Sequence, residues 1–127
     1  MNKPKKQILV VEDYPPTLRA LVDKFTREGF DVLEARDGEE GLELALKEHP
    51  DLILLDLKMP KMDGITMLKN LRADDSSKDI PVIILTNLNE PKKMAEALES
   101  ETYDYLVKTD WKLKDIVKKV KEKLGIK

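Results

Sequence analysis

Five short apolar stretches recur along the chain, separated by segments with helical periodicity. They cover residues 8–11, 32–35, 52–55, 82–85 and 105–107. Apart from Glu34, the stretches are continuously apolar rather than alternating, which is typical of strands covered on both faces. Strands that alternate with helices favour right-handed crossovers and a parallel sheet between two helical layers. We therefore expect a three-layer α/β fold with five strands and five helices, in a single domain that spans residues 1–127.

Helix signals mark the segments between these stretches. Pro15 and Pro16 suit an opening helical turn, because a missing N–H costs little there, and Gly29 suits the end of that helix. Asp37 and Glu40, three residues apart, resemble a capping box at the start of the second helix. The remaining helices are expected to begin near Asp63, near Pro91 and at Lys112.

The composition limits the chemistry that the chain can support. Hydrophobic residues make up 41% and charged residues 38%, with 23 Lys and Arg against 25 Asp and Glu, as in a folded globule. No apolar run approaches the roughly 20 residues of a membrane span, so we expect a cytoplasmic protein. Cysteine is absent and His49 is the sole histidine, which excludes thiol nucleophiles and clusters of cysteine or histidine ligands.

Positive charge is concentrated at both ends of the chain. Residues 112–127 carry seven lysines against two acids. Apolar side chains recur in this segment at helical spacing, which indicates an amphipathic helix with solvated lysines rather than a nucleic-acid-binding tail. These apolar residues are Leu113, Ile116, Val117, Val120 and Leu124.

Polar residues stand at the ends of four of the five predicted strands. Glu12 and Asp13 follow the first, Asp56 the third, Thr86 the fourth and Lys108 the fifth. In open α/β sheets, ligands bind beyond the carboxyl ends of the strands. Three acids, a hydroxyl and an amine are therefore expected to converge at one edge of the sheet.

This set of residues suits a magnesium ion and a phosphoryl group. Three neighbouring carboxylates repel one another unless a cation lies among them, and Mg²⁺ is usually held by one or two carboxylates together with a phosphate. Lys108 can offset the charge of a phosphoryl group, and Thr86 can donate a hydrogen bond to it. An aspartate beside a metal can be the nucleophile in phosphoryl transfer.

Four motifs carry these residues at characteristic intervals. They are Ile8-Leu9-Val10-Val11-Glu12-Asp13, Leu54-Leu55-Asp56-Leu57-Lys58-Met59-Pro60-Lys61-Met62-Asp63-Gly64, Ile84-Leu85-Thr86 and Asp104-Tyr105-Leu106-Val107-Lys108. In these motifs the chain resembles the response-regulator receiver domains of two-component signalling. The resemblance covers nearly all of the chain and implies a flavodoxin-like, doubly wound sheet with strand order 2-1-3-4-5.

The resemblance implies a role for each site residue. Asp56 would accept a phosphoryl group from a histidine kinase or a phosphotransfer protein. Asp13, Asp56 and the backbone carbonyl of Lys58 would ligate Mg²⁺, and Glu12 would act mainly through water. Thr86 and Lys108 would contact the phosphoryl oxygens.

Signal output is implied to depend on Tyr105, which would turn inward as Thr86 moves. The family uses the surface of its fourth helix, fifth strand and fifth helix to bind partners. Because the chain ends with its fifth predicted helix, we expect a stand-alone receiver that acts through an output protein whose identity the sequence does not give. We expect a monomer or a weak, phosphorylation-dependent dimer, without direct contact to nucleic acid or membrane.

The lifetime of the phosphoryl group is expected to be long. Lys58 and Leu88 lie two residues beyond Asp56 and Thr86, at positions that in this family flank the path of the attacking water. Neither side chain orients a water as an acid or an amide does. We therefore expect slow self-dephosphorylation and no other enzymatic activity.

Three alternatives differ in class from a phosphorylated receiver. A Mg²⁺-dependent phosphatase with an aspartyl nucleophile needs a second acid where Lys58 stands. A flavodoxin needs a phosphate loop rich in glycine and hydroxyls where Glu12 and Asp13 stand, and these acids repel phosphate. A receiver-derived binding module or engineered scaffold that is never phosphorylated remains compatible with the sequence.

Overall fold

The computed structural model describes residues 5–56, 61–86, 104–107 and 112–126. Within these residues, five parallel strands form one sheet in the order β2-β1-β3-β4-β5. The strands are β1 (Gln7–Val11), β2 (Asp31–Ala35), β3 (Leu52–Asp56), β4 (Val82–Thr86) and β5 (Asp104–Val107). The predicted doubly wound, flavodoxin-like sheet and its strand order are confirmed.

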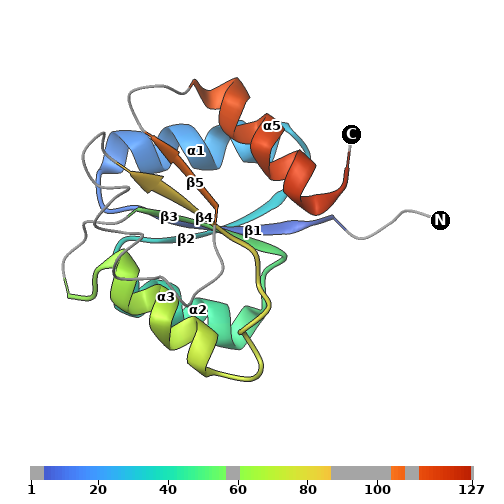
Figure 1. Cartoon of the computed structure of the whole chain (residues 1–127). Helices are drawn as coiled ribbons and strands as arrows, with labels where there is room; N and C mark the ends of the chain where they lie inside the picture. Colours follow the sequence, from blue (N-terminus) through green and yellow to red (C-terminus); the bar gives the residue numbers. More distant parts are fainter. Residues whose placement is uncertain (1–4, 57–60, 87–103, 108–111, 127) are drawn as a thin grey trace.

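Helices cover both faces of the sheet. Figure 1 shows α1 (Pro15–Arg27) and α5 (Leu113–Leu124) on one face, and α2 (Gly38–Glu48) and α3 (Gly64–Ala73) on the other. The described residues thus contain four of the five expected helices. The helix expected near Pro91 lies outside them.

The core has two halves, one on each face of the sheet. Ile8 and Val10 pack with α1 and α5, whereas Leu9 and Val11 pack with α2 and α3. All four side chains are at most 1% exposed. Successive side chains of a strand point to opposite faces, so a sheet buried on both sides requires apolar residues at every position. This is why the inner strands β1, β3 and β4 have continuous apolar runs, whereas the edge strand β2 carries the exposed Glu34.

Two aspartates start helices as the sequence predicts. The Asp37 carboxylate accepts a hydrogen bond from the Glu40 N–H at 2.8 Å at the start of α2. The Asp63 carboxylate accepts one from the Thr66 N–H at 2.8 Å at the start of α3. Each satisfies an N–H that has no partner within the helix.

The basic helix α5 is amphipathic. Ile116, Val117 and Val120 are buried against the α1 side of the sheet. Lys121 reaches across to α1, where its Nζ lies 3.0 Å from the Glu28 carboxylate. The lysines of α5 therefore surround an apolar stripe, as its spacing predicts. In the described part of the chain, no helix is long and apolar enough to cross a membrane.

Candidate functional site

Three acids meet at the carboxyl edge of the sheet. Asp56 is the last residue of β3, and Glu12 and Asp13 come directly after β1. The two strands are neighbours, and their register pairs Val11 with Leu55. The residues that follow this pair on each strand are therefore side by side, which brings together acids that are more than 40 positions apart in the sequence.

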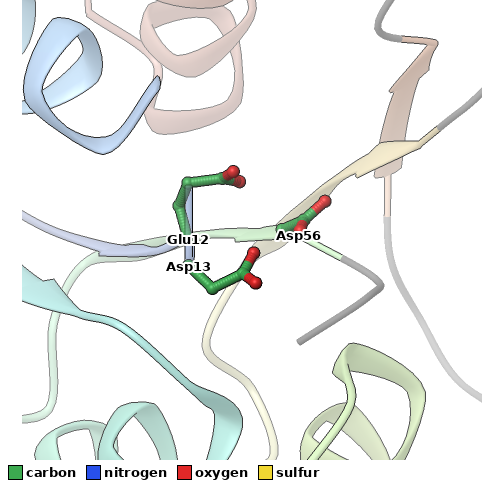
Figure 2. A group of neighbouring side chains, drawn as sticks. All are labelled: Glu12, Asp13 and Asp56. Atoms are coloured by element: carbon green, nitrogen blue, oxygen red, sulfur yellow. The ribbon is translucent and has the colours of Figure 1, made fainter. Parts of the chain in front are cut away.

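Their environments differ. Glu12 is 1% exposed and Asp56 is 6% exposed, whereas Asp13 is exposed to solvent. The Glu12 backbone is fixed because its N–H donates to the Ala35 carbonyl of β2 at 3.0 Å. Its Oε1 lies 3.4 Å from the Tyr14 N–H. Figure 2 shows the Asp13 carboxylate turned toward Asp56.

The arrangement fits a small divalent cation. One carboxylate oxygen of each of Glu12, Asp13 and Asp56 lies within 4.8 Å of the other two. Oxygens that share an octahedral Mg²⁺ at about 2.1 Å are about 3 to 4 Å apart, so small side-chain adjustments suffice. Because Asp13 is exposed, the cluster is open to solvent, which suits an ion such as Mg²⁺ that usually keeps several waters in proteins.

The structure describes only part of the other predicted site residues. Thr86 is the last residue of β4 and follows Leu85, which pairs with Asp56 across the sheet. Tyr105 lies in β5 and pairs with Ile84. The side chains of Thr86 and Tyr105 are outside what the structure describes. The same holds for all of Lys58, Leu88 and Lys108.

A further contact at this edge was not predicted from the sequence. The Gly38 N–H at the start of α2 donates to the Met62 carbonyl, which precedes α3, at 3.1 Å. Beside it, the Lys61 Nζ lies 3.8 Å from the Asp37 carboxylate. Glycine directly after a helix N-cap is a signal for such a close approach, because glycine stabilises a helix less than most other residues do.

Comparison with known proteins agrees with this geometry. Residues 8–121 match a family model described as the response regulator receiver domain. The chain is 40% identical to the probable transcriptional regulator ycf27 of Porphyridium aerugineum, over 82% of this chain and 42% of the relative. It is also 40% identical to the response regulator PleD of Caulobacter vibrioides, over 80% of this chain and 22% of PleD. The chain thus spans less than half the length of these relatives.

A solved receiver domain has the same fold. It comes from the sensor histidine kinase PA1611 of Pseudomonas aeruginosa PAO1 and holds a magnesium ion in its active site cleft. The two chains are 27% identical and superpose with a TM-score of 0.85, over 96% of this chain and 99% of that one.

Proposed function

Since the chain belongs to the response-regulator receiver domain family, whose members are phosphoacceptor signalling modules, we propose that Asp56 is the residue that accepts the phosphoryl group. The observation that carries this proposal is the place of Asp56. It ends the central strand β3, is 6% exposed, and has a carboxylate oxygen within 4.8 Å of oxygens of Glu12 and Asp13. The strand fixes the carboxylate, which favours in-line attack on a bound donor.

The proposed donor is a phosphohistidine of a histidine kinase or phosphotransfer protein. A carboxylate oxygen of Asp56 forms a bond to phosphorus as the phosphorus–nitrogen bond of the donor breaks. The leaving imidazole keeps the electron pair and takes up a proton. The product is an aspartyl phosphate, and the phosphoryl group changes carrier without net oxidation or hydrolysis.

Mg²⁺ is the proposed cofactor, with Asp13 and Asp56 as direct ligands and Glu12 acting through water. When bound, the ion offsets the negative charge of the phosphoryl oxygens. The distances among the three carboxylates support this assignment. The receiver domain of PA1611, which holds magnesium in its cleft, supports it as well. The family resemblance adds the backbone carbonyl of Lys58 as a third ligand.

We assign the contacts to the phosphoryl oxygens to Thr86 and Lys108, and the switch to Thr86 and Tyr105. The backbone of Thr86 supports this role, because it follows the residue that pairs with Asp56. A hydroxyl drawn toward the phosphoryl group would leave space for an aromatic ring, which shifts the balance between two states.

The proposed output is a change in affinity for a partner protein at the face of the fourth helix, β5 and α5.

The proposed location is the cytoplasm, because a histidine kinase that donates the phosphoryl group takes it from ATP. Lys58 and Leu88, as residue types, support slow loss of the phosphoryl group. Apart from this self-dephosphorylation, the protein would act as a signalling module and not as an enzyme.

The test is an intact-mass measurement after incubation with Mg²⁺ and acetyl phosphate. We expect the wild-type protein to gain one phosphoryl group that is stable in acid and lost in base, and EDTA to prevent the gain. Asp56→Asn should gain none, whereas Asp75→Asn, a change at an exposed residue of the α3–β4 loop, should react like the wild type. Equal labelling of Asp56→Asn would place the phosphoacceptor elsewhere. An unlabelled wild type would favour a binding module that is never phosphorylated.

A further inference from the structure

Helix α2 and the turn before α3 approach each other closely at Gly38. This glycine is the first residue of α2 and is buried. Its N–H donates to the Met62 carbonyl at 3.1 Å. A Cβ atom at position 38 would overlap the Met62 carbonyl oxygen and lie 2.8 Å from the carbonyl carbon and 3.0 Å from the Met62 Cβ. The contact thus leaves no room for any other residue unless the backbone of the turn moves.

Other contacts hold the same turn. Lys61 has a φ of 65°, which is left-handed, and its ammonium group lies 3.8 Å from the Asp37 carboxylate. The Asn70 side-chain amide lies 3.8 Å from the Met62 sulfur. Asp63 caps α3. The turn is therefore attached to both helices on this face of the sheet, and the steric limit comes from Gly38.

The position of this turn matters for the site because the turn completes the connection that starts at Asp56. Met62 lies six residues after Asp56 in the sequence. Gly38 follows β2 at the same carboxyl edge at which Glu12, Asp13 and Asp56 lie. The Gly38 contact therefore fixes where the chain beyond the phosphoacceptor strand must arrive.

We propose that Gly38 is a positioning residue for the magnesium and phosphoryl site. Gly38 acts through Met62. Because Gly38 has no side chain, α2 can hold the turn in the place that metal binding and phosphoryl transfer require. This inference rests on the proposed function of Asp56. Residues that orient the ligands of a metal typically change its affinity by roughly 10- to 100-fold when they are mutated.

The same helix offers a matched control. Gly41 is also buried in α2, and a Cβ there would lie 2.9 Å from Val11 Cγ2 and 3.2 Å from Met67 Cε. These atoms are ends of side chains in the core, not backbone of the turn. Gly41→Ala therefore disturbs packing without touching the turn, whereas Gly38→Ala displaces it. Glu39→Ala, at one of the two exposed positions between them, changes neither contact.

The experiment compares the three variants with the wild-type protein at a temperature at which all are folded. Mg²⁺ affinity is measured by NMR titration, and the rate of labelling with acetyl phosphate by intact mass. We expect Gly38→Ala to raise the Kd for Mg²⁺ about 10-fold, to slow labelling, and to shift the amide signals of Lys61 and Met62. Gly41→Ala should lower the Tm but keep the Mg²⁺ Kd of the wild type, and Glu39→Ala should match the wild type in both.

Two outcomes would overturn the inference. One is an unchanged Mg²⁺ Kd in Gly38→Ala, and the other is an equal rise in Gly38→Ala and Gly41→Ala, which would indicate general destabilisation. A wild-type protein that binds no Mg²⁺ and takes no label would instead contradict the proposed function itself.

A measurement on the wild-type protein covers the case in which Gly38→Ala does not fold. Coupling between two sites is reciprocal, so Mg²⁺ must strengthen the Gly38 contact if that contact strengthens Mg²⁺ binding. We expect Mg²⁺ to slow hydrogen exchange at the Gly38 N–H more than at the His49 N–H, which donates to Ala45 at the other end of α2. Equal slowing at both amides would contradict the proposal.

Discussion

Glu12 and Asp56 occupy equivalent places on neighbouring strands, because each directly follows the Val11–Leu55 pair in the register of β1 and β3. Both side chains are buried, at 1% and 6% exposure. With the exposed Asp13 beside them, the edge of the sheet gathers three carboxylates whose oxygens lie within 4.8 Å of one another. Such a cluster is repulsive by itself and attractive to a cation.

The first prediction concerns this repulsion. Without Mg²⁺, Asp13→Ala should unfold at a higher urea concentration than the wild type. Two unit charges about 4 Å apart interact by about 1 kcal/mol in water, so the free energy of unfolding should rise by about that amount. With Mg²⁺, the wild type should gain Tm and Asp13→Ala should gain little or none.

Asp23→Ala is the control for this prediction, because Asp23 is an exposed acid of α1 away from the cluster. It should gain as much Tm from Mg²⁺ as the wild type does. An undiminished gain in Asp13→Ala would place the metal elsewhere.

The second prediction concerns the ion pair that joins α1 and α5. The pKa of the Glu28 carboxyl lies below its ordinary value of 4.5. The main cause is the Lys121 ammonium at 3.0 Å, and the Lys24 ammonium at 3.3 Å contributes less. A carboxyl whose pKa is lowered by folding stabilises the protein above its ordinary pKa, and this is lost as the pH falls through the folded-state pKa. The stability of the wild type should therefore fall as the pH drops below 4.5, and Glu28→Gln should lack that part of the fall.

Urea unfolding between pH 7 and pH 3 measures this difference. Glu122→Gln, on α5 in the same region, is the matched control, because Glu122 has no ion pair among the residues that the structure describes. Glu122→Gln should follow the wild-type curve. Parallel curves for Glu28→Gln and the wild type would show that the pair contributes nothing to the pH dependence.

The third prediction concerns the start of α3. Asp63→Ala removes the side chain that accepts the Thr66 N–H, and should lower the free energy of unfolding by about 1 kcal/mol. Asp63→Asn keeps an acceptor oxygen and should lose only a small part of that. Urea denaturation measures both, and equal losses would indicate that the charge matters rather than the cap.

The fourth prediction concerns the lifetime of the phosphoryl group. The double variant Lys58→Asn, Leu88→Glu supplies an amide and an acid that can orient an attacking water. Its aspartyl phosphate should decay faster than that of the wild type, as followed by intact mass after removal of the donor. A decay that is unchanged or slower would mean that these two side chains do not set the lifetime.

The parallel strands and three site residues could be predicted from local patterns, whereas the strand order 2-1-3-4-5 came from the resemblance to receiver domains. Continuous apolar runs indicated strands buried on both faces, and Leu9 and Val11 do pack opposite to Ile8 and Val10. The parallel order of the strands places their carboxyl ends at one edge. Residue type and strand position were therefore sufficient to bring Glu12, Asp13 and Asp56 together.

Contacts between distant segments could not be predicted in this way. The approach of Gly38 to Met62 depends on the distance between α2 and the turn before α3, which no residue pattern encodes. The ion pair of Glu28 and Lys121 joins residues 93 positions apart, and any of several lysines on α5 could have formed it by charge alone. Such contacts depend on helix packing, which becomes known only with the fold.

The central claim is that Asp56 carries the phosphoryl group, and borohydride trapping tests it at the level of one residue. Borohydride reduces an acyl phosphate to an alcohol with loss of phosphate, which converts a phosphorylated aspartate to homoserine. Peptide mapping of the wild-type protein after treatment with Mg²⁺, acetyl phosphate and borohydride should find homoserine at position 56 and unmodified Glu12 and Asp13. Reduction at position 12 or 13, or at no position in a protein that has gained a phosphoryl group, would contradict the account.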